Sequence, residues 1–299
     1  MIGGLLLGAG LRAADMVAHL LPRGAAYALA GLIGRAWHRL APGRRAVVAA
    51  NLARVCAATG RATSGAAFER LVRRAFVEHA RYYLEVLRIP HDSVEAVGEM
   101  VSVDEWERWR PLLQGGAVVA TLHFGNPEPY GSFLAANGLK AVVPIEEIRP
   151  RALYEFLLKR RASGRGAEMV PVSRALRRLV EAARQGGVVA IAADRDFAGD
   201  GHPVTLFGAP TTLPTGPATL ALMTGRPLLA AACWRIGPER FNARAWPIEV
   251  DATGDRRADV AALTEAMGRR FEEAIGANPE QWFGAFQPIW PEDRNAPDA

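Results

Sequence analysis

The sequence predicts an α/β fold in which a mostly parallel central sheet is flanked by helices and preceded by an N-terminal apolar helical region. Two short, continuous runs of β-prone apolar residues, at 117–122 and 187–193, are typical of strands that are buried on both faces. Helical patterns alternate with these runs and with further strand-like segments at 140–144, 168–172 and 227–234. Strands that alternate with helices indicate an α/β sheet.

The helices follow from the spacing of apolar residues. Over 44–56 and 68–87 these residues recur at three- and four-residue steps, with charged residues between them, and this pattern predicts amphipathic helices. A further helical stretch contains Trp106 and Trp109. Helices are also expected between the strands, over 130–137, 150–161 and 175–184. The uncharged segment 203–225 is rich in proline and threonine and predicts a loop that leads into a helix.

Positive charge is concentrated at the start of the chain. The formal net charge of the whole chain is +5, whereas residues 1–60 alone carry seven arginines and one aspartate. The uncharged runs 1–11 and 24–34 are each much shorter than the roughly 20 apolar residues that cross a bilayer. We expect these helices to lie in a membrane interface as a hairpin, with arginines against anionic head groups, two ordinary core helices being the alternative.

The chain is thus expected to have three parts. Residues 1–43 form the membrane-associating helices, residues 44–290 form the α/β domain, and residues 291–299 form a loose tail. The cysteines, Cys56 and Cys233, lie far apart and have no clustered histidines beside them, so neither a disulfide framework nor a metal site is expected. Nucleic-acid binding is supported only by generic charge.

Chemically competent residues follow two of the predicted strands. His123 comes directly after the first buried run, and Asp194-Arg195-Asp196 comes directly after the second. In open α/β sheets, ligands bind beyond the carboxyl ends of the strands. Glu128 stands five positions after His123, across a turn, and a carboxylate bonded to one ring nitrogen makes the other nitrogen a better base.

A nucleophile that would complete a triad is missing from this pattern. The sequence has no Gly-x-Ser-x-Gly elbow, and Ser132 falls in a predicted helix. The substrate must then supply the nucleophile, and an alcohol that attacks an activated acyl group suits a lone histidine and acid. A hydrolase or thioesterase that uses the same pair on water remains a rival. A purely structural histidine is the other alternative.

Several segments, in order, resemble those of the bacterial glycolipid acyltransferases, which include lipid A late acyltransferases and phosphatidylinositol mannoside acyltransferases. His123 to Glu128 resembles the family's H-x4-D/E motif, and the phosphatidylinositol mannoside branch is the more similar one. The other matching segments are Asn51-Leu52-Ala53-Arg54, Ala193-Asp194-Arg195-Asp196-Phe197, Phe207-Gly208 with Leu213 to Ala218, and the aromatic segment from Pro279 to Trp290. Glu128 departs from the aspartate that is usual in that branch.

The resemblance implies transfer of a fatty acyl chain from acyl-CoA or an acyl carrier protein to a hydroxyl of a membrane glycolipid. The acceptor would be phosphatidylinositol mannoside-like, with a lipid A-type acceptor as the alternative, and no cofactor would be needed. The expected place is the cytoplasmic face of the bacterial inner membrane, with peripheral or N-terminal attachment to its anionic surface. A non-enzymatic basic membrane-binding protein is the rival of another class.

The resemblance also implies roles for individual residues. His123 would be the general base, and Glu128 or Asp194 would orient it; the sequence does not separate these two carboxylates. Residues expected to bind substrate are Arg195, Asp196, Arg161, Glu146 and Asn126. Arg195 would stabilise a thioester oxyanion or bind a phosphate. The alternative for Asp196 is a structural role, in which it pairs with Arg195.

Overall fold

The computed structural model describes residues 2–162 and 167–291. Its main helices are α1 (Ile2–Leu20), α2 (Arg23–Leu40), α3 (Pro42–Ala58), α4 (Gly65–Arg88), α5 (Val94–Gly98), α6 (Trp106–Gln114), α7 (Glu128–Ala136), α8 (Arg151–Ala162), α9 (Ala175–Arg184), α10 (Gly216–Thr224) and α11 (Arg256–Ala277). Its strands are β1 (Val101–Val103), β2 (Ala117–Thr121), β3 (Ala141–Ile145), β4 (Ala167–Pro171), β5 (Val188–Ala192), β6 (His202–Leu206), β7 (Ala209–Leu213), β8 (Leu228–Gly237) and β9 (Arg240–Ile248).

Seven strands form the central sheet in the order β1-β9-β8-β2-β5-β3-β4. Strands β8, β2, β5, β3 and β4 are parallel to one another, whereas β9 returns antiparallel to β8 and pairs in parallel with β1. The predicted mostly parallel sheet flanked by helices is confirmed. Strand β9 and the short β1 were not anticipated, because neither has the continuous apolar run of a central strand.

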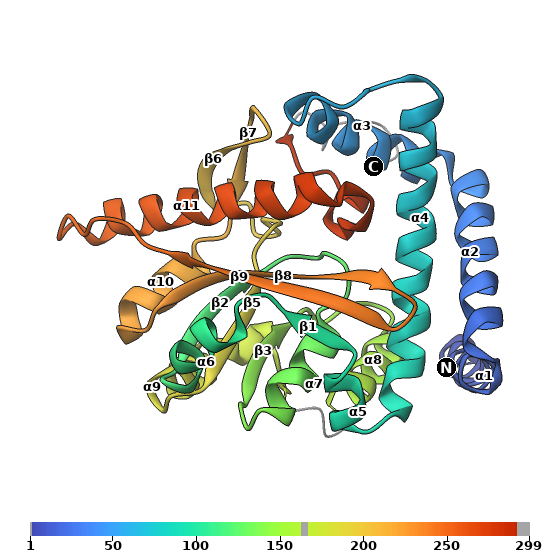
Figure 1. Cartoon of the computed structure of the whole chain (residues 1–299), viewed down its shortest axis with the longest axis horizontal. Coiled ribbons are helices and arrows are strands. Elements are labelled where there is room, and N and C mark those ends of the chain that lie inside the picture. The colour runs from blue at the N-terminus through green and yellow to red at the C-terminus, as the bar shows by residue number, and fades with distance from the viewer. Residues whose placement is uncertain (1, 163–166, 292–299) are drawn as a thin grey trace.

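Alternate residues of β2 face two different hydrophobic clusters. Val118 and Ala120 belong to the cluster that includes Phe271 of α11, and Ala117 and Val119 belong to the cluster that includes Leu113 of α6. Figure 1 shows α11 and α6 on opposite faces of the sheet. This burial on both faces explains why the strand is apolar at every position.

A second, two-stranded sheet is formed by the antiparallel hairpin β6–β7. The interpretation of this segment as a loop was wrong, although the helix α10 does follow it. Phe207 and Gly208 connect the strands and both have positive φ, of 50° and 75°, as in a two-residue hairpin turn. Prolines are tolerated here because each strand of a two-stranded sheet has one free edge, where a backbone N–H is not needed to bond a neighbouring strand.

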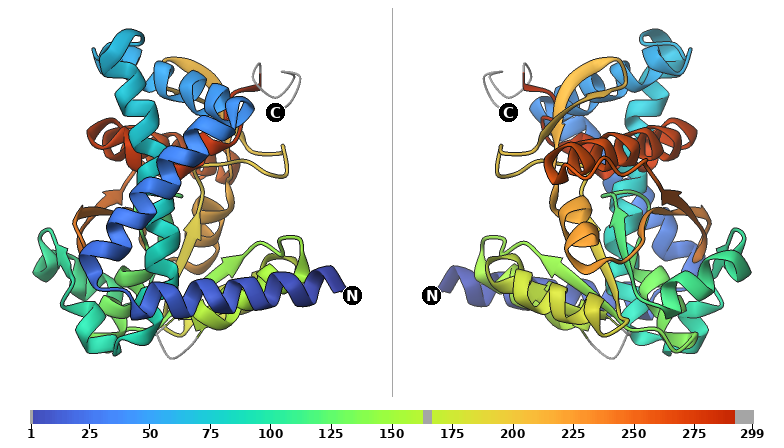
Figure 2. Two further views of the ribbon diagram at one scale, coloured as in Figure 1. Left: turned by 90° about the vertical axis from the view of Figure 1, so that its right-hand side faces the viewer. Right: turned by 90° about the vertical axis from the view of Figure 1, so that its left-hand side faces the viewer.

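The first two helices form an elbow at Leu21–Pro22 in place of the expected hairpin. Helix α2 packs along α4, whereas α1 contacts α4 and runs beside α8 (Figure 2). The packing of α2 is close because Gly34 lies against the α4 backbone: a Cβ at Gly34 would lie 2.6 Å from Cα of Val77. Arg88 of α4 fixes the elbow by donating hydrogen bonds to the carbonyls of Ala18 and Leu21.

No helix among the described residues is both long enough and apolar enough to cross a membrane. The outward faces of α1 and α2 nevertheless carry exposed apolar side chains: Met16, Val17, Leu20, Leu29, Leu32, Ile33 and Leu40. Membrane association of residues 1–43 therefore stays a prediction. Most of the predicted tail, 292–299, lies outside the described residues.

Candidate active site

The register of β2 and β5 brings His123 and Asp194 together. Thr121 pairs with Ala192 at the ends of the two strands, so the residue two positions further on each strand reaches the same point beyond the sheet. Nδ1 of His123 lies 2.7 Å from Oδ1 of Asp194, and the backbone N–H of His123 donates to the same oxygen at 3.0 Å. The ring and the backbone of His123 are thus both fixed by one carboxylate.

Asp194 is 1% exposed. Burial alone would raise the pKa of its carboxyl group, but the charges of His123 and Arg195 and the hydrogen bonds from His123 and Trp282 outweigh burial and lower the pKa to about 2. Asp194 is therefore ionised at neutral pH and accepts a hydrogen bond from Nδ1–H of His123. This assignment leaves the lone pair of the imidazole on Nε2.

The indole of Trp282 completes the surroundings of the buried carboxylate. Its Nε1–H donates to Oδ2 of Asp194 at 3.0 Å. The backbone N–H groups of the next two residues, Phe283 and Gly284, donate to the carbonyl of His123 at 2.7 and 3.2 Å. Sequence reasoning did not give Trp282 this role, although the residue stands in the aromatic segment that carried the family resemblance.

The aromatic segment 279–290 is also held by residues 51–54, the first of the segments that resemble the family. The amide of Asn51 donates to the carbonyls of Ala285 and Gln287, both at 2.8 Å, and the guanidinium of Arg54 lies 4.7 Å from the centre of a Trp290 ring. The segments at the two ends of the resemblance therefore contact each other and support the site together.

Glu128 and Asn126 occupy the turn after His123. The carboxylate that bonds Nδ1 of His123 is Asp194, while Glu128 is half-buried and begins α7. Asn126 is fully buried, and its side-chain oxygen accepts from the backbone N–H of Glu128 at 3.1 Å. Asn126 was expected to bind substrate, but its amide is engaged by protein groups beneath the site.

Arg195 lies over the other side of the imidazole. Its Nη2 is 3.2 Å from Nε2 of His123, and its guanidinium stacks 4.3 Å from the ring centre of Phe197. Burial lowers the pKa of Arg195, and the negative charge of Asp194 and Glu146 counteracts part of this effect. Glu146, which follows β3, thus contributes to the electrostatic environment of the arginine.

Two further residues were predicted to bind substrate, Asp196 and Arg161, and the structure describes the side chain of only the first. Asp196 accepts hydrogen bonds from the N–H groups of Gly199 and Gly201 and from the hydroxyl of Thr212, so it ties the loop after β5 to the β6–β7 hairpin. This supports a structural contribution from Asp196. Arg161 belongs to α8, but its side chain lies outside the described residues.

An aromatic wall from α4 stands beside the site. The imidazole of His79 stacks between Phe283 and Tyr83, with ring centres 4.5 and 5.0 Å apart. Burial, together with the charges of Arg195 and His123, lowers the pKa of His79 to about 3, so His79 is neutral at pH 7. The wall was not predicted, because Phe283 reaches it from the C-terminal segment, and His79 and Tyr83 fit the spacing of an ordinary amphipathic helix.

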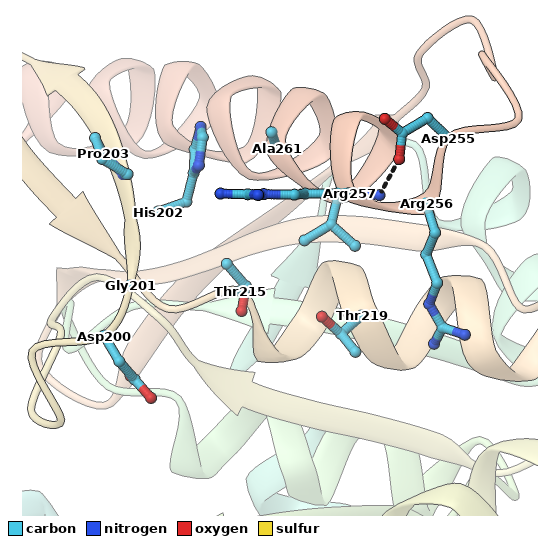
Figure 3. A pocket seen from close by; sticks show the side chains of 11 residues that line it. Asp200, Gly201, His202, Pro203, Thr215, Thr219, Asp255, Arg256, Arg257 and Ala261 are labelled. Carbon is cyan, nitrogen blue, oxygen red and sulfur yellow. Dashed lines mark hydrogen bonds between the residues drawn. The ribbon is translucent and has the colours of Figure 1, made fainter.

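A pocket of about 640 Å³ lies at the base of the β6–β7 hairpin (Figure 3). Arg257 reaches from α11 toward His202, and Asp255 accepts a hydrogen bond from the backbone of Arg257. The pocket's two arginines are matched by two aspartates, so its charge does not favour an anionic ligand. Among the described residues, no group of three histidine, cysteine, aspartate or glutamate residues is placed to hold a metal ion.

Comparison with known proteins agrees with the geometry. The sequence model of bacterial lipid A biosynthesis acyltransferases matches residues 8–290. The phosphatidylinositol mannoside acyltransferase of Mycobacterium tuberculosis (strain CDC 1551 / Oshkosh) is 34% identical over 226 residues, covering 71% of this chain and 67% of that protein. The phosphatidylinositol mannoside acyltransferase of Mycolicibacterium smegmatis is 32% identical over 226 residues, covering 74% and 72%. These matches count against a non-enzymatic membrane-binding protein. The chain belongs to the bacterial lipid A biosynthesis acyltransferase family and is an acyltransferase.

Proposed function

We propose that this acyltransferase moves a fatty acyl chain from acyl-CoA or an acyl carrier protein to a hydroxyl of a phosphatidylinositol mannoside-like glycolipid, with His123 as general base. The observation that carries the proposal is the 2.7 Å contact between Nδ1 of His123 and the buried, ionised Asp194. The acceptor class is supported by the names of the two relatives. A lipid A-type acceptor is the alternative, supported by the family description.

The proposed reaction needs no acyl-enzyme. Nε2 of His123 removes the proton of the acceptor hydroxyl while the oxygen attacks the thioester carbonyl carbon. The tetrahedral intermediate then expels the thiolate, which takes the proton from the imidazolium. Asp194 holds the ring and stabilises its positive charge. Ser132, the serine nearest to Glu128 in the sequence, is fully buried on α7 and is a poor nucleophile candidate.

Arg195 is proposed to stabilise the oxyanion that develops on the thioester oxygen. Its Nη2 lies 3.2 Å from Nε2 of His123, next to the place where the reacting carbonyl would stand. A cation held this close to the base suits a negative charge that appears only during the reaction. Glu146 is proposed to hold this guanidinium from the substrate side, and Arg161 to bind substrate.

The proposed place of the enzyme is the cytoplasmic face of the bacterial inner membrane, attached through residues 1–43. The support is the exposed apolar face of α2, which includes Leu32 (57% exposed) and Ile33 (54%), together with the arginines of this region. Apolar side chains would enter the lipid while the arginines meet anionic head groups. Residues 44–290 would then form the catalytic domain.

The test of the reaction compares the wild type with His123→Ala and His123→Gln. Each is incubated with labelled acyl-CoA, or acyl carrier protein, and with either phosphatidylinositol mannoside or lipid A precursor. We expect acylated glycolipid from the wild type and a loss of at least about 10³-fold in both variants. Undiminished transfer by His123→Ala would refute the proposed base, and release of free fatty acid alone would indicate a thioesterase.

Membrane attachment is tested separately by sedimentation with anionic phospholipid vesicles. Leu32→Glu and Ile33→Glu should release the protein from the vesicles, because each places a carboxylate on the proposed lipid face. Leu112→Glu is the matched control, since Leu112 is also an exposed leucine (39%) but lies on α6. Equal sedimentation of all three variants would contradict attachment through α2.

A further inference from the structure

A buried carboxylate on α4, Glu85, connects distant parts of the chain beneath the active site. Glu85 is fully buried. It accepts hydrogen bonds from the hydroxyl of Tyr27 at 2.6 Å, from Nη2 of Arg235 at 2.9 Å and from the side-chain amide of Asn126 at 3.0 Å. These donors come from α2, from β8 and from the turn that follows His123.

Asn126 has no freedom to rotate while these contacts hold. Its side-chain oxygen accepts from the N–H of Glu128, so its amide nitrogen must face Glu85. Its backbone N–H donates to the carbonyl of Cys233 at 3.2 Å. The neighbouring Gly125 approaches β8 so closely that a Cβ there would lie 2.1 Å from the same carbonyl. The turn from His123 to Glu128 is therefore held in one place by Glu85 and by β8.

A second carboxylate, that of Glu78, also binds Arg235, but no hydrogen bond joins it to the turn that follows His123 among the described residues. Arg235 is held by Glu85 through Nε and Nη2 and by Glu78 through Nη1. Burial opposes its charge, but the two carboxylates outweigh burial and raise the pKa of Arg235, so the guanidinium stays charged. The other oxygen of Glu78 accepts from Arg81 at 2.8 Å. Glu78 is thus a close counterpart of Glu85 that differs in its partners.

We propose that Glu85 is a positioning residue for acyl transfer, which acts through Asn126 on the turn that carries His123. The inference rests on the proposed function for its kinetic consequence. A displaced turn would move His123 relative to the acceptor hydroxyl, and rate is lost steeply with such displacement even when binding is retained. Glu85 touches neither the reacting atoms nor His123, so its effect must appear as a change in geometry.

The experiment compares Glu85→Gln with Glu78→Gln. Both remove one carboxylate from Arg235, and both are expected to lower the melting temperature. Only Glu85→Gln weakens the hold on the turn, because glutamine has one acceptor oxygen for the side chains of Asn126, Tyr27 and Arg235, which share two carboxylate oxygens in the wild type. We expect kcat of Glu85→Gln to fall by on the order of 10²-fold at unchanged KM for donor and acceptor, and kcat of Glu78→Gln to stay within about threefold.

A compensating change tests the direct link. In the double variant Glu85→Gln with Asn126→Asp, donor and acceptor exchange places while the total charge is conserved. The carboxylate at position 126 can still accept from the N–H of Glu128, so we expect at least about a tenfold recovery of kcat over Glu85→Gln. No recovery, or equal losses of kcat in Glu85→Gln and Glu78→Gln, would overturn the positioning role and leave the proposed reaction intact.

A readout independent of turnover accompanies the kinetics. The imidazole NMR signals of His123, assigned by their loss in His123→Gln, report the environment of the ring. They should shift in Glu85→Gln and return toward the wild-type positions in the double variant, while Glu78→Gln leaves them in place. Unchanged signals in Glu85→Gln would refute the inference even if the acceptor had been wrongly chosen.

Discussion

Replacement of Asp194 by asparagine tests the central pair most directly. The aspartate accepts from the ring and backbone of His123 through one oxygen and from Trp282 through the other. Asparagine has one acceptor, so either Trp282 or His123 must face an amide N–H2. If the amide faces His123, the ring changes tautomer, Nε2 carries the proton and the base is lost; if the amide oxygen faces His123, the neutral side chain no longer stabilises the positive charge of the imidazolium. We expect kcat to fall by about 10³- to 10⁴-fold, as for a triad with the wrong tautomer.

The same variant has a stability consequence that depends on pH. The pKa of Asp194 falls from an ordinary 3.8 to about 2 in the folded protein, which corresponds to about 2 kcal/mol. Because the folded pKa is the lower one, this stabilisation is complete above pH 4 to 5 and is lost as the pH falls toward 2. The free energy of unfolding should therefore differ between wild type and Asp194→Asn at pH 7, and the difference should shrink between pH 4 and pH 2.

The assay is acyl transfer at saturating donor, with urea unfolding of both proteins at several pH values. Asp196→Asn is the matched control, because Asp196 is a neighbouring carboxylate whose partners belong to the loop and hairpin rather than to His123. A kcat of Asp194→Asn within about threefold of the wild type would refute the orienting role. A stability difference that is the same at pH 7 and pH 2 would refute the reasoning on the pKa.

Two glycine substitutions test the packing that places the site and α2. Gly125→Ala should destabilise the protein by about 3 kcal/mol and lower kcat, because Gly125 has φ of 57° and an added Cβ would meet the carbonyl of Cys233; thermal unfolding and turnover measure both. Gly34→Val should loosen α2 from Val77 of α4 and lower the melting temperature, whereas Gly24→Val on the same helix, with no atom within 4 Å, should change it little. Equal melting temperatures for these two valine variants would contradict the close packing of α2.

The parts of the fold that the sequence predicted well are those whose pattern depends on local burial. The strand at 117–122 and the helix at 175–184 were located almost to the residue, because one is apolar at every position and the other is amphipathic. The hairpin β6–β7 was missed since its prolines and its Phe207-Gly208 turn are typical of a loop. The elbow between α1 and α2 depends on Arg88, which comes much later in the chain, so no local pattern could indicate it.

In the candidate site, too, the residues marked by a local pattern were predicted, and those placed by distant contacts were not. His123 and Asp194 were found because each ends a buried strand, and the strand register that pairs them is a general property of parallel sheets. The choice between Glu128 and Asp194 could not be made from sequence spacing, since it depends on which strands are neighbours. Trp282 and Glu85 could not be placed at all, because one approaches from the C-terminal segment and the other from a helix that crosses the strand ends.

The contacts of residues 282–284 with His123 and Asp194 have a consequence for synthesis of the protein. The apolar helices α1 and α2 leave the ribosome before the α/β domain, whereas the indole that bonds Asp194 and the N–H groups that hold the His123 carbonyl are translated after all seven strands of the central sheet. A nascent chain would thus present its proposed lipid-binding face long before its proposed catalytic pair is locked, since folding follows the order of synthesis. Premature termination upstream of Trp282 would yield a protein that keeps the proposed lipid-binding face but lacks the contacts that lock the pair of His123 and Asp194.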